Sequence, residues 1–334
     1  MSIDISYGLA ISMVLVASFM WGSWMQVVKH LDDYPFDAFV LNVFIVSVVF
    51  VWSVMLAVYG VEGWQTIVGT AQQNPAAVWV TLACGFLYVM GMSINLSVMA
   101  KAGLVLSTSV SSSTSIIIGT LVSIVVGGLA PGVSLPLLVV GGVVLLLAVI
   151  VCVRSIQVRD KDLSESPVAG GRDESMPVLK AVGWALVAAL FVPAYPLAMS
   201  VGLRSPFHPD ALPSLCFMAV LSLGAFLGVL ATSGVRLVRR GQLKLWAKTP
   251  VKYWALAGVS AICHYGGNMI NSLASPVIGV AIAWPMGTSY NMWTYIWGLA
   301  YGEFRGASRK AYALLFTGIG LFVSGVAVLT VALY

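Results

Sequence analysis

The chain has 334 residues, of which 60% are hydrophobic and only 9% are charged, and its formal net charge is +5. About a quarter of the residues of a soluble globular domain are charged, so this composition argues against an ordinary soluble enzyme and indicates a protein that crosses a membrane several times. The basic residues are distributed over short loops and form no single patch, so the net charge does not indicate nucleic acid binding.

Ten apolar segments are long enough to cross a bilayer, which requires about 20 mostly apolar residues. Turn-forming stretches such as "LDDYPFD", "QQNP" and "GGLAPG" separate them. The chain is therefore predicted to be an all-α polytopic membrane protein with helices at 6–29, 37–60, 77–99, 103–127, 135–154, 178–202, 211–235, 252–273, 277–301 and 311–332.

One stretch in the middle of the chain, residues 155–177, is rich in charged residues and contains Gly and Pro. It is predicted to be a cytoplasmic linker between two five-helix units, residues 1–154 and 178–334. Sliding the second unit over the first by 173 positions places Gly85 on Gly258 and Asn95 on Asn268. Because each unit has an odd number of helices, the second is inverted relative to the first, which is a common plan of secondary transporters that work by alternating access.

The distribution of Lys and Arg predicts the orientation of the chain. Of the 17 basic residues, 16 fall after the first, third, fifth, seventh and ninth helices or next to those loops, and only Arg204 falls on the other side. Cytoplasmic loops carry an excess of Lys and Arg. The basic loops are therefore predicted to face the cytoplasm, with both termini on the extracytoplasmic side of the inner or plasma membrane.

Polar and aromatic side chains recur at helical spacing within several apolar segments. His264, Asn268 and Asn271 stand at i, i+4 and i+7, so they share one face of the segment 252–273. An amide without a partner in hydrocarbon costs roughly 4 to 8 kcal/mol, so such groups must face protein, water or solute. The candidate solute-binding residues are Trp21, Trp24, Gln26, Asn95, His264, Asn268, Asn271, Trp284, Thr288 and Asn291.

Two interpretations of these residues are open. Each amide or hydroxyl could hydrogen-bond to a neighbouring helix, at about 0.6 to 2 kcal/mol apiece, and the serine-rich stretch "STSVSSSTS" at 107–115 could simply allow close packing. Taken together, however, amides, hydroxyls and flat aromatic rings suit a neutral polyhydroxylated solute such as a monosaccharide. His264 is the candidate for proton coupling, because imidazole titrates near neutral pH; the alternative is a neutral histidine bonded to another helix.

No motif for catalysis or for a cofactor is evident. The sequence has no phosphate-binding loop, no Ser/His/Asp arrangement and no metal-ligand cluster, so we expect no enzyme activity, cofactor or metal. The rival functions are an exporter of amino acids or of lipophilic or cationic metabolites, and a membrane-embedded enzyme on a lipid-linked substrate. Such an enzyme would have to use the acidic cluster Asp32, Asp33 and Asp37.

Two stretches resemble a known transporter family. "FMWGSWMQVVKHLDDYPFDAFVLNVF" (19–44) resembles the first hairpin of the sugar-uptake branch of the drug/metabolite transporter superfamily. "GVAIAWPMGTSYNMWTYIWGLAYGEFRGASRK" (279–310) resembles the ninth helix and the following loop of the L-rhamnose–proton symporter family. The family-like positions are Trp21, Gly22, Lys29, Trp284, Pro285, Trp297, Gly302, Glu303 and Gly306.

The resemblance implies ten helices in two inverted repeats, with a central cavity built from helices 1, 3, 4, 6, 8 and 9. It also implies proton-driven uptake of a sugar such as rhamnose. Glu303, Arg305 and Gly306 are then expected at the cytoplasmic end, as loop structure or as a gate. Other members of the superfamily move amino acids, nucleotide sugars, ureides and amphipathic compounds, so the resemblance does not identify the solute. The oligomeric state is not predicted.

Overall fold

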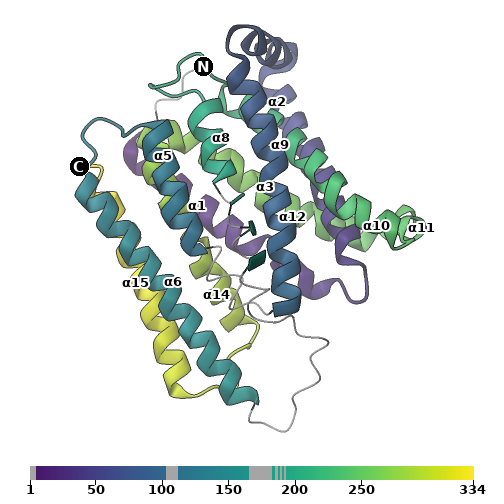
Figure 1. Ribbon diagram of the computed structural model, residues 1–334, viewed down its shortest axis with the longest axis vertical. Coiled ribbons are helices and arrows are strands. Elements are labelled where there is room, and N and C mark those ends of the chain that lie inside the picture. The colour runs from purple at the N-terminus through teal and green to yellow at the C-terminus, as the bar shows by residue number, and fades with distance from the viewer. Residues whose placement is uncertain (1–4, 103–111, 165–182, 185–186, 189, 192) are drawn as a thin grey trace.

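The computed structural model describes residues 5–102, 112–164, 183–184, 187–188, 190–191 and 193–334. Helices joined by short turns make up this part of the chain, and it contains no β-strand (Figure 1). Isolated β-bridges join Leu203 to Leu212 and Ser205 to His208 in one loop. The predicted all-α class is therefore confirmed for the described residues.

The first half of the chain begins with a capped helix, because the Ser6 hydroxyl accepts the backbone N–H of Leu9 at 3.3 Å. Two irregular elements occur in this half: η1, a 3₁₀ turn, and η2, a π-helical turn. The elements are α1 (Tyr7–Ser23), η1 (Gln26–His30), α2 (Phe36–Gln73), α3 (Pro75–Ala102), η2 (Ser115–Gly119), α5 (Thr120–Gly127) and α6 (Leu135–Ser164).

The second half has a second π-helical turn, η3, and a helix that is interrupted next to Thr288 and Ser289. Its elements are α8 (Ala194–Gly202), α9 (Ser214–Val229), η3 (Leu230–Gly234), α10 (Val235–Arg239), α11 (Leu243–Ala247), α12 (Val251–Ile278), α13 (Val280–Gly287), α14 (Tyr290–Ala300) and α15 (Arg309–Val331).

Six helical stretches of the described chain are long and apolar enough to cross a membrane, which makes this a multi-pass membrane protein by length and composition. They are Tyr7–His30, Phe36–Gln73, Pro75–Asn95, Leu135–Leu163, Ser214–Arg239 and Arg309–Val331. The predicted segment 252–273 forms α12, a helix of 28 residues whose polar stripe lowers its mean hydropathy. Of the other predicted spans, residues 103–111 and parts of 178–192 lie outside the described residues.

Several predicted boundaries differ from the structure. The helix predicted to end at residue 60 bends there, at Gly60 with φ of 58°, and then continues to Gln73. Residues 155–164, predicted to begin the linker, instead extend α6; residues 165–177 lie outside the described residues. The predicted continuous helix 277–301 is divided into α13 and α14.

Close helix pairs determine where the core lies. α6 and α15 pack along each other at one edge of the molecule, and α3 packs against α9 (Figure 1). Glycines permit these approaches: a Cβ on Gly224 would lie 2.0 Å from the carbonyl oxygen of Leu82, and a Cβ on Gly318 would lie 2.3 Å from the sulfur of Cys152. Between these two pairs lie α1, α12 and α13: α12 packs on α9, α13 packs on α6 and α15, and α1 packs on α12 and α13.

Candidate functional site

The polar face of α12 is buried at the centre of the helix bundle. His264 and Asn268 are each 3% exposed, and Asn271 is fully buried. Gly267, between the first two, lets α1 approach, because a Cβ there would lie 3.0 Å from the Trp21 ring. The local sequence "HYGGNMIN" therefore combines polar groups with the small residues that allow a neighbouring helix to reach them.

His264 is surrounded by aromatic rings from three helices. Its Nε2 atom lies 2.9 Å from the Tyr88 hydroxyl of α3. The Trp24 ring stacks on the imidazole at 4.3 Å between centroids, and Phe44 and Tyr265 meet it edge-on. The other ring nitrogen, Nδ1, has no hydrogen-bond partner among the described residues. The imidazole thus has one bonded and one free nitrogen.

Asn268 is held by α1. The Trp21 indole Nε1–H donates to the Asn268 Oδ1 atom at 2.8 Å. The same Trp21 ring meets Tyr195 of α8 edge-on, at 6.2 Å between centroids. The hydrogen bond between Trp21 and Asn268 joins the first predicted helix to the segment predicted at 252–273, and its two residues are 247 positions apart in the sequence.

Asn271 and Tyr195 supply two further polar atoms without partners. The Asn271 amide Nδ2 contacts the Met199 sulfur at 3.6 Å, but its Oδ1 atom has no partner in the described part of the chain. The Tyr195 hydroxyl lies near Asn271, yet the geometry falls short of a hydrogen bond. Trp284 packs on Tyr195 at 5.6 Å between ring centroids.

Trp284 connects this cluster to the π-helical turn η2. Its indole Nε1–H donates to the carbonyl oxygen of Ser115 at 2.9 Å. Gly119 leaves room for the ring, since a Cβ there would lie 2.1 Å from the indole nitrogen. We use the name central cluster for the set Trp21, Trp24, Tyr88, Tyr195, His264, Asn268, Asn271 and Trp284, whose members are buried or half-buried.

The other predicted site residues bond elsewhere. Gln26 donates from Nε2 to the Gly22 carbonyl at 3.2 Å, and Thr288 donates to the Pro285 carbonyl at 2.6 Å. Asn291 donates to the Thr288 carbonyl and accepts the Ser112 hydroxyl at 3.1 Å. These side chains bond to nearby backbone or, at Asn291, join the helical residues just before η2 to α14.

Two predicted features lie at the edge of the described chain. Asn95 is half-buried on α3, two turns beyond Tyr88, and has an interaction of its own. In the serine-rich stretch, residues 107–111 lie outside the described residues, whereas Ser112 and Ser115 contact the second half of the chain as described above.

Tyr195 and Tyr88 were not among the predicted site residues. Tyr88 stands seven positions before Asn95, on the same helical stripe, so the periodicity that selected Asn95 applies to it as well. Tyr195 lies between Pro193 and Pro196, and prolines within an apolar segment indicate a kinked helix. A tyrosine next to a proline within an apolar segment is the sequence feature that could have identified Tyr195 as a site residue.

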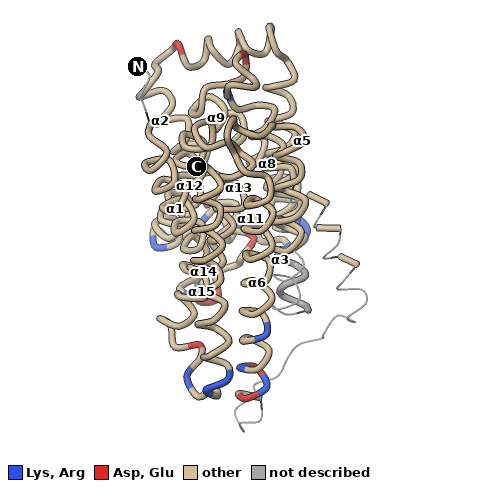
Figure 2. Tube along the Cα trace, turned by 90° about the vertical axis from the view of Figure 1, so that its left-hand side faces the viewer, with Lys and Arg blue, Asp and Glu red and all other residues tan. Residues whose placement is uncertain are grey.

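Ion pairs join separate elements at the end of the molecule where the basic loops lie. The Glu303 carboxylate pairs with Lys29 of η1 and, at 3.4 Å, with Arg159 of α6. The Lys29 ammonium also lies 3.8 Å from the centroid of the Tyr301 ring. We call Lys29, Arg159 and Glu303 the Glu303 network; Figure 2 shows basic residues gathered at the lower ends of α6 and α15, near it.

Two of the three residues of the acidic cluster that an enzyme would need, Asp32 and Asp37, are engaged in ion pairs. Asp37 is buried and pairs with Arg236 at 2.7 Å and with Arg240 at 3.1 Å. Asp32 pairs with Lys252 at 2.6 Å, and this hydrogen bond lowers the pKa of the Asp32 carboxyl. Within the described ranges, no group of three or more His, Cys, Asp or Glu side chains could hold a metal ion.

No protein-family model matches the chain, and no curated protein matches it either. The function is therefore inferred from the geometry of the central cluster and from the packing around it.

Proposed function

We propose that the protein is a secondary transporter that imports a small neutral polar solute, of which a monosaccharide such as rhamnose fits best. The observation that carries this proposal is the set of buried polar atoms without partners in the central cluster: His264 Nδ1, Asn271 Oδ1 and the Tyr195 hydroxyl. A buried polar atom left unpaired costs about 1 to 3 kcal/mol. A solute with several hydroxyls, each able to donate and to accept, would supply the partners.

The character of the cluster favours a neutral, ring-shaped solute. The side chains that bond to or stack on His264, Asn268 and Asn271 carry no formal charge. The faces of Trp24 and Trp284 offer flat apolar area of the kind that covers the C–H surface of a sugar ring. In the present conformation the Trp24 ring stacks on His264 and the Trp284 ring packs on Tyr195, so the site is closed and must open for the solute to enter.

Helix packing supports the ten-helix, inverted-repeat plan. α1 packs on α12, and its counterpart α8 packs on α3; α1 also packs on α14, as α8 does on α5. α2 pairs with its counterpart α9, and α6 with its counterpart α15. This is the pattern expected from a two-fold axis in the membrane plane.

The interrupted helices also support a transport function. α13 ends and α14 begins next to Thr288 and Ser289, and the π-helical turn η2 faces Trp284 of α13. Discontinuous or bulged helices at the meeting point of two repeats are common where transporters bind their solutes. The central cluster draws on the predicted segments 1, 3, 6, 8 and 9, and segment 4 contacts it through the Ser115 carbonyl. These are the six helices that the resemblance to the L-rhamnose–proton symporters implies.

Orientation and energy source complete the proposal. The end that carries the Glu303 network would face the cytoplasm by the distribution of Lys and Arg, which places the protein in the inner or plasma membrane. His264 would carry the coupled proton, because it is the imidazole at the centre of the cluster and one of its nitrogens is free.

A second candidate is supported by the density of aromatic rings. Trp21, Trp24, Tyr88, Tyr195 and Trp284 would also suit a lipophilic or quaternary-ammonium compound, which binds aromatic faces without needing hydrogen bonds. The protein would then be an exporter of amphipathic metabolites. The unpaired polar atoms described above favour the sugar.

Thermal stabilisation of the purified protein separates the candidates. We expect L-rhamnose or a related monosaccharide to raise the unfolding temperature, and choline and glycine not to, because a ligand that binds only the folded state stabilises it. Asn271→Leu should abolish the sugar effect, whereas the control Asn291→Leu should retain it, since Asn291 bonds to Thr288 and Ser112, outside the central cluster. Stabilisation by choline alone would overturn the sugar proposal in favour of the exporter.

A further inference from the structure

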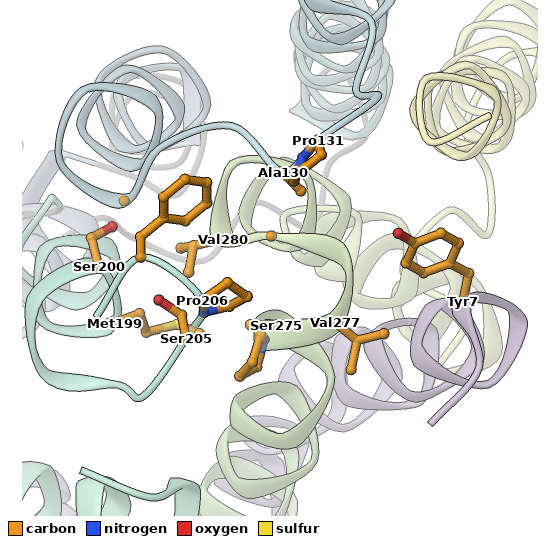
Figure 3. Close-up of a pocket in the computed structure, with 14 residues that line it drawn as sticks. Tyr7, Ala130, Pro131, Met199, Ser200, Ser205, Pro206, Ser275, Val277 and Val280 are labelled. Atoms are coloured by element: carbon orange, nitrogen blue, oxygen red, sulfur yellow. The ribbon is translucent and has the colours of Figure 1, made fainter. Parts of the chain in front are cut away.

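A cavity of about 130 Å³ lies beside the turn between α5 and α6, at the end of the molecule opposite the turn between α14 and α15 that carries Glu303 (Figure 1). The start of α1, the turn between α5 and α6, the loop after α8 and the break between α12 and α13 surround it. We call it the Ser200 cavity. Figure 3 shows Met199, Ser200, Ser205 and Pro206 on one side of it and Tyr7 and Val277 on the other.

The lining of the Ser200 cavity is neutral and carries hydroxyl groups. None of its 14 lining residues has a charged side chain, and Tyr7, Ser200, Ser205 and Ser275 each bring a hydroxyl. The Ser200 side chain is 2% exposed, and its hydroxyl has no hydrogen-bond partner among the described residues. A buried hydroxyl on a cavity wall without a protein partner is a place for a ligand or water hydroxyl.

Two residues of the cavity wall also contact the central cluster. The Met199 sulfur lies 3.6 Å from the side-chain Nδ2 atom of Asn271, and the Ser275 hydroxyl donates to the backbone carbonyl oxygen of Asn271 at 2.7 Å. One layer of side chains therefore separates the Ser200 cavity from Asn271. Methionine suits a movable barrier, because its unbranched side chain adopts several conformations at low cost.

We propose that the Ser200 cavity is a second, outer site for the hydroxyl groups of the solute and that Met199 is the barrier between it and the central cluster. This inference rests on the proposed transport function. The volume corresponds to about four water molecules at ~30 Å³ each, so the cavity holds one edge of a sugar or a small polyol. Gly279, with φ of 80°, forms part of the wall at the break between α12 and α13, where the wall can widen.

Cysteine labelling tests the outer site. In a variant with Cys84, Cys152, Cys216 and Cys263 replaced by Ala, Ser200→Cys is exposed to a membrane-impermeant methanethiosulfonate from the face opposite the basic loops. We expect labelling, and we expect L-rhamnose at ten times its dissociation constant to slow it about tenfold. The control is Gln72→Cys, which is exposed near the end of α2, outside the cavity wall, and should be labelled at the same rate with or without sugar.

The outcomes separate this inference from the function on which it rests. Labelling that L-rhamnose does not slow, or labelling only from the face of the basic loops, overturns the outer site. Sugar uptake by reconstituted vesicles without protection of Ser200→Cys keeps the transporter and removes the outer site. Protection without uptake keeps the site and removes the transport function.

The barrier is tested in the same background with Met199→Phe and Met199→Leu. The larger, stiffer Phe should lower L-rhamnose uptake at least about tenfold while sugar still protects Ser200→Cys, because the outer site comes before the barrier. Leu keeps the volume and should retain both properties. If Met199→Phe leaves uptake unchanged, or if it loses protection together with uptake, Met199 is not the barrier.

Discussion

The two ends of the bundle are closed in different ways. At the basic end, Glu303 joins Lys29 and Arg159, so separate elements are held by charges that remain partly accessible to water. At the opposite end, uncharged residues surround the Ser200 cavity, and Met199 in its wall contacts Asn271. Ion pairs that join separate elements must break when those elements separate, whereas side-chain packing can yield by rotation of single side chains. The comparison suggests that the basic end opens by separation of helices and that the other end opens by local movement.

The largest expected effect lies between the two ends, at Asn268. Asn268→Leu removes the acceptor for the Trp21 indole N–H and leaves that donor buried, at a cost of about 1 to 3 kcal/mol. We expect solute uptake to be abolished while the variant still folds, as judged by size-exclusion chromatography and circular dichroism. Retained affinity for the sugar in a binding assay would assign Asn268 to packing alone, and the two ends would then share no central site.

A smaller effect is expected when the Glu303 network is broken. Glu303→Gln removes two partly exposed ion pairs worth about 0.2 to 1 kcal/mol each, so the population open at the basic end should rise about 2- to 30-fold. The measurement is the labelling rate of Ser23→Cys, next to η1, from the cytoplasmic face. Glu62→Gln at the opposite end is the control, and high salt should reproduce the effect in the wild type. An unchanged rate would mean that the ion pairs do not hold this end closed.

The pH dependence of uptake should disappear in His264→Gln. Gln retains a hydrogen-bonding group toward Tyr88 but does not titrate, so proton-driven uptake that rises as external pH falls should become flat between about pH 5 and 8. Uptake is measured in vesicles with and without an imposed proton gradient. A variant that keeps the wild-type pH profile removes the coupling role from His264.

The smallest effect is expected at Asp32, on the surface of the basic end. Lys252 lowers the pKa of this carboxyl, so the pair contributes at pH values above the ordinary pKa of aspartate and is lost as the pH falls through the lowered one. Because both groups are exposed, Asp32→Asn should leave the unfolding temperature and uptake at pH 7 nearly unchanged. A large loss of uptake would place Asp32 within the closing contacts of that end, beside Glu303.

The sequence by itself determined the membrane class and the polar stripe of α12. Scarce charge over long apolar segments leaves few alternatives, and the spacing of His264, Asn268 and Asn271 is a local property of a helix. By contrast, the tertiary structure decided that Tyr88 and Tyr195 belong with this stripe. It also decided that Gln26 and Thr288 bond to nearby backbone and that Asn291 bonds to Thr288 and Ser112.

The physical reason is the distance along the chain between partners. Trp21 and Asn268 are 247 positions apart, and Tyr88 and His264 are 176 apart. Helical periodicity indicates which residues share a face, but which face meets which depends on the close approach of helices at positions such as Gly267. Whether a polar side chain finds a nearby carbonyl or points toward another helix is decided only when the helices pack.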